Sequence, residues 1–350
     1  MTLTAVLHHL AFAVGLALLS AAAVRLMIAV QVLDRPNARS AHTLPTPKGG
    51  GVGIVLAFLV GVAVLYRYAS FARLADAYFV GLIAASAAMA LVALLDDVLD
   101  WPFTVKLGAQ VGATLLAVAS GLYLRDYRVP YVGGFYVGWV GVPITIVWIL
   151  FTTNAMNFID GLNGLAGGVT LVAACFLAAI AAVHNAPFAY FAALLLAAGV
   201  VGFLPFNFPR ARIFMGDVGS QFCGFVLATL AVVASRFEDV ELSFLLVPML
   251  LSGVLFDVAF TLGRRLLAGE RITEAHRGHL YQVAARSGVP PWVVTLIHVG
   301  FAVFGGLVAL VFIAVSSAVK PLVPLLTLAP QVVWLAYIGH RSRVAGLDTW

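Results

Sequence analysis

Long apolar runs alternate with short polar segments along the whole chain. A transmembrane helix needs about 20 predominantly apolar residues to cross a hydrocarbon core of about 30 Å. The short segments of alternating hydropathy that indicate a membrane β-barrel do not recur. We therefore predict an all-α, polytopic bundle of about eleven membrane-spanning helices, over residues 5–30, 49–66, 77–95, 104–122, 137–153, 165–183, 187–205, 218–235, 242–263, 291–315 and 321–339.

The composition agrees with this class of protein. Hydrophobic residues make up 63% of the 350 residues and charged residues 10%, and the mean hydropathy is +1.05. A soluble domain of this length is far more polar, so an integral membrane protein is predicted. We expect one transmembrane domain over residues 1–350, because no linker or shift in composition divides the chain.

Basic residues cluster after the first apolar run. No Lys or Arg precedes Arg25, so this run lacks the positive start of a cleaved signal peptide, and we expect it to be retained as a span. Arg35, Arg39 and Lys48 follow, and the positive-inside rule places this loop in the cytoplasm and the N-terminus outside. The pI near 9.4 fits this orientation and an attraction to anionic headgroups or phosphates. Nucleic acid is not expected as a partner, because basic and aromatic residues form no shared patch.

A polar, glycine-rich segment separates the fifth and sixth apolar runs. Residues 154–168 contain Asn154, Asn157 and Asp160, and four glycines follow Asp160. Amide and ionisable side chains are costly at the end of a membrane span and need partners. We interpret this segment as the site around which the rest of the chain is organised.

Similar polar segments follow the other odd-numbered runs. Taken alone, each also fits an ordinary interfacial loop or helix end, and for the Lys48 loop this simpler interpretation is favoured. Adjacent carboxylates repel each other, so an acidic pair is expected to meet a metal, a lysine or a shared proton. Two histidines without further ligands nearby favour phosphate binding over zinc. The side chains concerned are Lys48, Asp96, Asp97, Lys106, Asn207, Asp217, His276, Arg277 and His279.

The order of the segments places them on one side of the membrane. They follow the first, third, fifth, seventh and ninth runs, and an even number of crossings separates each from the next. We therefore expect all of them to open on the cytoplasmic face. A transporter would instead need polar groups near mid-membrane that can be reached from both sides, and this remains the alternative from another functional class.

The predicted site combines acidic side chains, basic side chains and helix starts next to glycine, all at one membrane surface. This combination suits a reaction that transfers a group between two phosphorylated reactants. Carboxylates hold Mg²⁺ together with substrate phosphates, while Lys, Arg and His offset the remaining negative charge. The free N–H groups at the helix start near Gly216 and Asp217 also favour phosphate. The location indicates one soluble and one lipid reactant.

Five segments together resemble the motifs of one enzyme superfamily. They look like the polyprenyl-phosphate N-acetylhexosamine-1-phosphate transferases, glycosyltransferase family 4, which are related to the phospho-N-acetylmuramoyl-pentapeptide transferase of peptidoglycan synthesis. The resemblance spans residues 34 to about 282 in order. It is carried by Asp34-Arg35-Pro36-Asn37 with Pro45-Thr46-Pro47, Asp96-Asp97 with Asp100, residues 154–161, Phe214-Met215-Gly216-Asp217 and His276-Arg277-Gly278-His279.

This resemblance implies a multi-pass enzyme of the bacterial inner membrane. Such an enzyme transfers a sugar 1-phosphate from a UDP-N-acetylhexosamine to undecaprenyl phosphate and releases UMP, with Mg²⁺, or Mn²⁺, as cofactor. It implies catalytic roles for Asp96, Asp97, Asp217, His276 and His279, metal binding by Asp217 and Asp97, and substrate binding by Lys48, Lys106, Asn154, Asn157, Asp160, Asn207 and Arg277. The roles of the Asp96/Asp97 pair, base or orienting group, and the oligomeric state, with a homodimer as one candidate, stay open.

Two departures from the family pattern bear on the substrate. Asn163 stands where many members have a second acid, and Leu280-Tyr281-Gln282 stands where others have further histidines. The second departure resembles a branch that initiates O-antigen in lipopolysaccharide synthesis with 6-deoxy sugars, N-acetylfucosamine or N-acetylquinovosamine. It argues against muramoyl-pentapeptide as substrate. N-acetylglucosamine remains an alternative sugar.

Overall fold

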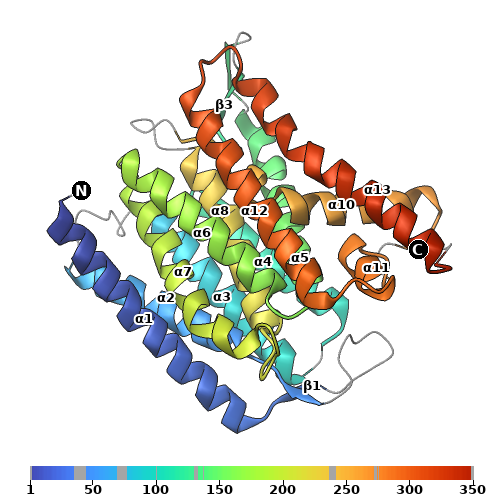
Figure 1. Ribbon diagram of the computed structural model, residues 1–350. Coiled ribbons are helices and arrows are strands. Elements are labelled where there is room, and N and C mark those ends of the chain that lie inside the picture. The colour runs from blue at the N-terminus through green and yellow to red at the C-terminus, as the bar shows by residue number, and fades with distance from the viewer. Residues whose placement is uncertain are drawn as a thin grey trace.

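The computed structural model describes residues 2–34, 45–68, 77–99, 101–129, 133–136, 138–235, 242–271, 274 and 276–347. The motif residues at positions 35–37 and 100 lie outside this part of the chain. Within it the protein is a bundle of long helices with two short β-hairpins (Figure 1). The predicted class, a polytopic all-α membrane protein, is confirmed.

The helices coincide with the apolar runs. Two of the segments are subdivided: α9 continues into α10, and a 3-10 helix, η3, leads into α13. The bounds are α1 Leu3–Val30, α2 Gly51–Tyr68, α3 Ala77–Leu99, α4 Phe103–Ala119, η2 Gly138–Val140, α5 Gly141–Phe158, α6 Leu165–Val183, α7 Pro187–Asn207, α8 Asp217–Ala234, α9 Leu246–Leu250, α10 Ser252–Leu267, α11 Leu280–Arg286, α12 Pro291–Ala314, η3 Lys320–Thr327 and α13 Leu328–Val344.

In the described residues, nine helical segments are long and apolar enough to cross a membrane. The predicted spans at 104–122 and 242–263 are not among them, because α4 has 17 residues and the second region is divided at Leu251 between α9 and α10. The count of eleven spans and the orientation of the bundle stay predictions.

Helix α8 forms the centre of the bundle. Almost all of its residues are buried, whereas α1 and α13 lie at the periphery (Figure 1). Small residues allow its neighbours to approach: a Cβ atom on Gly51 of α2 would lie 2.2 Å from the Cα of Gly219. Close packing of this sort between α2 and α8 brings the starts of both helices together.

The two hairpins mark opposite ends of the bundle (Figure 1). Strands β1 (Leu33–Asp34) and β2 (Thr46–Pro47) pair antiparallel at one end. At the other end β3 (Asp126–Val129) pairs antiparallel with β4 (Gly133–Tyr136), with Asp126 opposite Tyr136. The β1 end carries the polar segments that follow α1, α3, α5, α7 and α10, and it is the end that contains the candidate site.

Candidate active site

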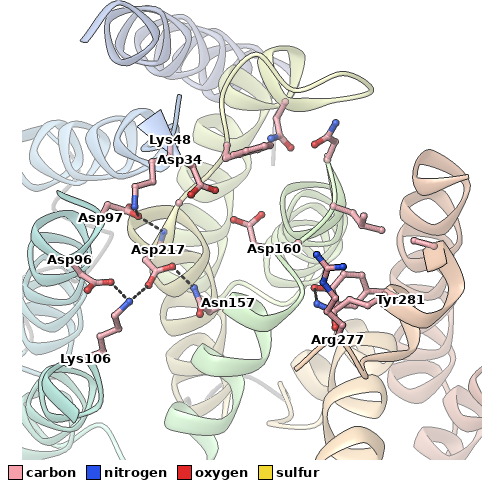
Figure 2. Close-up of a pocket in the computed structure, with 18 of the residues that line it drawn as sticks. Asp34, Lys48, Asp96, Asp97, Lys106, Asn157, Asp160, Asp217, Arg277 and Tyr281 are labelled. Atoms are coloured by element: carbon pink, nitrogen blue, oxygen red, sulfur yellow. Dashed lines mark hydrogen bonds and ion pairs between the residues drawn. The ribbon is translucent and has the colours of Figure 1, made fainter. Parts of the chain in front are cut away.

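A polar cavity of about 420 Å³ opens at the β1 end of the bundle (Figure 2). Nine of the twelve side chains predicted from the sequence line it: Lys48, Asp96, Asp97, Lys106, Asn157, Asp160, Asn207, Asp217 and Arg277. They come from segments spread over more than two hundred residues of sequence. The structure therefore brings together polar segments that the sequence could relate only by counting membrane crossings.

One side of the cavity is formed by Lys48, Asp96, Asp97, Lys106 and Asp217, which we call the acid–lysine cluster. The Lys106 ammonium lies 2.6 Å from Asp96 Oδ2 and 3.5 Å from Asp217 Oδ2, and the Lys48 ammonium lies 3.6 Å from Asp97 Oδ1. Each lysine thus offsets negative charge from carboxylates that would otherwise repel one another. The cluster can accept further anions only with additional positive charge.

The two adjacent acids have different environments. Asp97 accepts hydrogen bonds from the backbone N–H groups of Asp217 (3.2 Å) and Val218 (3.1 Å), so it caps the start of α8. Gly216 leaves room for this contact, with a φ of +75°, because a Cβ atom there would lie 2.6 Å from Asp97 Oδ2. Asp96 instead binds Lys106 and accepts the Trp101 N–H at 2.9 Å. The helix-capping role of Asp97 was not foreseen from the sequence.

Asp217 is oriented by amides. Asn157 Nδ2 donates to Oδ1 at 3.0 Å and Gln221 Nε2 donates to Oδ2 at 3.1 Å. A chain of amides continues into the bundle: Gln110 Nε2 donates to Gln221 Oε1 at 3.1 Å, and Asn154 Nδ2 donates to Gln110 Oε1 at 2.7 Å. Asn154 does not line the cavity, and this chain of amides links it to Asp217.

Asn207 holds the backbone of the turns around the cavity. Its Oδ1 accepts the Gly164 N–H at 2.6 Å, and its Nδ2 donates to the Ile213 carbonyl at 2.9 Å. These bonds join the turn after α5 to the segment before α8. Because both amide atoms are engaged with backbone, Asn207 shapes the cavity through these turns as well as lining it.

The predicted histidines do not line the cavity. His279 is buried, and its Nδ1 lies 3.2 Å from Asp257 of α10. Burial, with the charges of His279, Arg265 and Arg264 adding to it, lowers the pKa of His276 to about 4. His276 is therefore neutral at neutral pH, which agrees with its Nδ1 accepting the Gly278 N–H at 3.1 Å. We expect Arg277 to supply the positive charge here.

The opposite side of the cavity contains Arg277, which the sequence predicted, and three residues that it did not, Tyr281, Gln282 and Arg286. We call Arg277, Tyr281, Gln282 and Arg286 the α11 wall, since they lie in α11 or just before it. Figure 2 shows Asp160 between the acid–lysine cluster and Arg277 and Tyr281. Gln282 and Tyr281 had appeared only as a departure from a histidine-rich pattern, and no sequence signal placed them on the cavity surface.

Asp160 follows α5 and borders the cavity. Burial, together with the negative charges of Asp217 and Asp97, raises its pKa well above the usual 3.8. Because the pKa is higher in the folded than in the unfolded state, the stabilisation is complete below the unfolded pKa and is lost as pH rises through the folded one.

We therefore expect the melting temperature of the ligand-free protein to fall as pH rises above about 4, and Asp160→Asn to flatten this fall. Thermal unfolding of both proteins between about pH 4 and about pH 8 measures the difference. Glu274→Gln, at an exposed position, serves as the control and should follow the wild type. Parallel curves for wild type and Asp160→Asn would contradict the expectation.

The donor set fits a metal ion that is shared with a substrate. Among the described residues, no group of three or more His, Cys, Asp or Glu side chains could hold a metal by itself. Mg²⁺ is commonly bound through one or two carboxylates together with waters and substrate phosphates. Asp217 and Asp160 border the same cavity and could supply these carboxylates (Figure 2). Both oxygens of Asp97 already accept backbone N–H groups, so its predicted metal role competes with its capping of α8.

Fold and cavity together describe a polytopic membrane protein with a cavity lined by charged side chains at one end of its bundle. The sequence model described as "Glycosyl transferase family 4" matches residues 79–235. The chain is 30% identical to a probable undecaprenyl-phosphate N-acetylglucosaminyl 1-phosphate transferase of Bacillus subtilis (strain 168), over 73% of this chain and 70% of that protein. The chain belongs to glycosyl transferase family 4, the superfamily of polyprenyl-phosphate N-acetylhexosamine-1-phosphate transferases.

Two further relatives show the breadth of this superfamily. The chain is 30% identical to a decaprenyl-phosphate N-acetylglucosaminephosphotransferase of Mycobacterium tuberculosis, over 79% of this chain and 75% of that protein. It is 33% identical to a phospho-N-acetylmuramoyl-pentapeptide-transferase of Acetivibrio thermocellus, over 54% of this chain and 59% of that protein. The resemblance inferred from the five segments is thereby confirmed, and the protein is a multi-pass membrane enzyme of this superfamily.

Proposed function

We propose that this protein transfers a sugar 1-phosphate from a UDP-N-acetylhexosamine to undecaprenyl phosphate, forms undecaprenyl-diphospho-sugar and releases UMP. The observation that carries this proposal is the convergence of the acid–lysine cluster, Asp160 and Arg277 on one cavity at the end of the bundle. Such a site suits two anionic reactants, one soluble and one anchored in lipid. The name of the Bacillus subtilis relative specifies undecaprenyl phosphate and N-acetylglucosaminyl 1-phosphate, and that of the Mycobacterium tuberculosis relative specifies decaprenyl phosphate. Both names support a polyprenyl phosphate as the lipid reactant.

In the proposed reaction an oxygen of the lipid phosphate attacks the sugar-linked phosphorus of the donor in line. The bond from that phosphorus to the bridging oxygen breaks, and the oxygen leaves with UMP. Positioning and neutralisation of charge supply most of the rate enhancement in phosphoryl transfer. Lys48, Lys106 and Arg277 can offset the negative charge of the reactants at the cavity surface. Mg²⁺, or Mn²⁺, held by Asp217 with Asp160, would add to this neutralisation when bound.

The geometry favours an orienting role for Asp96 and Asp97 over that of a general base. A phosphate with a second pKa near 6 is mostly dianionic at neutral pH, so its attacking oxygen does not need a strong base. Asp96 is paired with Lys106, and Asp97 accepts two backbone N–H groups. Both carboxylates therefore hold other groups in place: Asp96 holds the lysine, and Asp97 holds the start of α8.

The identity of the sugar has two candidates with different support. Leu280-Tyr281-Gln282 resembles the branch that uses the 6-deoxy sugars N-acetylfucosamine or N-acetylquinovosamine to initiate O-antigen, and two of these residues belong to the α11 wall. The names of several relatives instead specify N-acetylglucosamine. In either case we place the enzyme in the bacterial inner membrane, in the synthesis of lipopolysaccharide or another cell-envelope polysaccharide.

A panel of UDP-sugars tests the proposal. The purified full chain is mixed with undecaprenyl phosphate, Mg²⁺ and each donor in turn, and UMP and the lipid diphosphate product are measured. UDP-N-acetylfucosamine, UDP-N-acetylquinovosamine, UDP-N-acetylglucosamine and UDP-N-acetylmuramoyl-pentapeptide form the panel. Release of UMP that depends on the lipid is expected with at least one of the first three donors. No product with any of these three would contradict the proposal.

The competing function is ion-coupled transport by the same acids. It would require acids deep within the bundle, whereas Asp97 lies near the end of α3 and Asp217 is the first residue of α8. Asp96, Asp97, Asp160 and Asp217 all border a cavity at the β1 end. This arrangement supports transfer chemistry at one membrane surface.

A further inference from the structure

A buried carboxylate outside the cavity collects the hydrogen-bond donors at the start of α11. Asp257 lies in α10 and is 1% exposed. Its Oδ1 accepts the Leu280 N–H at 2.9 Å, and its Oδ2 accepts the Tyr281 N–H at 3.0 Å. His279 Nδ1 and the Thr261 hydroxyl lie 3.2 Å and 3.3 Å from the same Oδ1. One side chain from α10 therefore serves several donors around the first turn of α11.

These contacts satisfy the first backbone N–H groups of α11. The first N–H groups of a helix have no partner within the helix, and they need an acceptor from elsewhere when they are buried. Helix α11 has seven residues, and an isolated helix of this length is not stable in water. Asp257 caps it from another helix. Without this carboxylate, buried N–H groups of Leu280 and Tyr281 would be left unsatisfied.

Tyr281 connects α11 to the turn that contains Asp160. Its hydroxyl donates to the carbonyl of Phe158 at 2.8 Å, at the end of α5. The hydroxyl also lies against Gly161, where a Cβ atom would come within 2.3 Å of it. The path from Asp257 through Tyr281 thus ends beside Asp160 at the cavity.

The acid–lysine cluster is supported independently. Its contacts come from α3, α4, α5 and α8, from the backbone at the start of α8, and from Lys48, which follows β2. Figure 2 shows this cluster on the far side of Asp160 from Arg277 and Tyr281. A change at Asp257 should therefore disturb one side of the cavity and spare the other.

We propose that Asp257 is a positioning residue that holds the α11 wall and, through Tyr281, the Asp160 turn in place for substrate binding. It touches neither the cavity nor the reacting groups, and it acts by satisfying the N–H groups at the start of α11. The expected effect of this role on turnover rests on the proposed function. The expected effect on the stability of α11 does not.

Two variants of the full chain test this role, with hydrogen exchange and turnover as readouts. In Asp257→Leu, amide exchange over residues 280–286 should rise about tenfold, because two buried N–H groups lose their acceptor. In α3 and α8 it should not change. Asp257→Asn retains one acceptor oxygen, so its effect should lie between those of wild type and Asp257→Leu. Turnover with the best UDP-sugar of the panel should fall in the same order, by about tenfold in Asp257→Leu.

A matched control removes another buried polar contact of α10. Gln331 of α13 is 1% exposed and donates to Ser252 at the start of α10, at 3.4 Å. Gln331→Leu should leave both the exchange of residues 280–286 and the turnover within about twofold of wild type, because its contact does not involve α11.

The possible outcomes separate the two proposals. If wild type makes no lipid diphosphate but the exchange pattern appears, the proposed function fails and the positioning role stands. If wild type is active but Asp257→Leu exchanges like wild type over residues 280–286, the positioning role fails. It also fails if exchange rises evenly along the chain, or if neither variant yields folded protein, because Asp257 would then support the whole fold.

Discussion

Asp217→Asn is expected to lower turnover by about a thousandfold while the protein remains folded. Asp217 begins α8, borders the cavity and accepts hydrogen bonds from Asn157 and Gln221. Asparagine has the same shape but lacks the negative charge that a divalent ion and its phosphate ligands require. Release of UMP from the best UDP-sugar measures the effect, and circular dichroism with the melting temperature reports folding.

Glu274→Gln is the matched control for this change. It also replaces a carboxylate by an amide, but its side chain is 62% exposed and pairs with Arg271, which is itself exposed. Its turnover should equal that of wild type, because exposed ion pairs contribute little. Wild-type activity in Asp217→Asn would remove Asp217 from the proposed metal site and would leave the cluster with an electrostatic role alone.

Lys106→Met is expected to have the second large effect, on both turnover and stability. Lys106 is the cation between Asp96 and Asp217, and Asp96 is 3% exposed. Removing one partner of a buried ion pair leaves an uncompensated charge, which costs about 3 kcal/mol of folding free energy. Turnover should fall by about a hundredfold, since the two carboxylates then repel each other and the incoming phosphates. Chemical denaturation and UMP release measure the two effects.

A double variant separates these effects. Lys106→Met with Asp96→Asn removes the buried charge together with its partner, so most of the lost stability should return. Turnover should not recover, because the positive charge beside Asp217 is still missing. Recovery of both quantities would show that Lys106 serves only to compensate Asp96.

The sequence located the helices well because the signal for a membrane span is strong. A run such as 165–183 must be helical and apolar to cross a bilayer, and α6 has these bounds. The division of 242–263 into α9 and α10 was not predicted, although Pro248 and Gly253 flank the break at Leu251, because proline and glycine also occur within continuous membrane-spanning helices. Hydropathy alone does not distinguish one continuous span from two consecutive helices.

The sequence predicted some residues of the site correctly and misplaced others. Asp96, Asp160 and Asp217 could be selected because a charge at a span end is costly, whatever its neighbours are. The same argument could not predict whether His279 lines the cavity. A histidine near an arginine in a polar loop fits phosphate binding equally well, and the contact of His279 with Asp257, 22 residues earlier, depends on how α10 and α11 pack.

By itself the sequence determined the membrane class, the approximate spans, the family and the side chains that needed polar partners. All of these follow from the cost of placing polar groups near hydrocarbon or from the order of local motifs, and both are properties of the linear chain. Only the tertiary structure decided which partner each group has: Asp97 on the N–H groups of α8, Lys106 between two acids, and Asp257 at the start of α11. These pairings depend on how helices pack in space, and a one-dimensional pattern of polar residues does not contain that information.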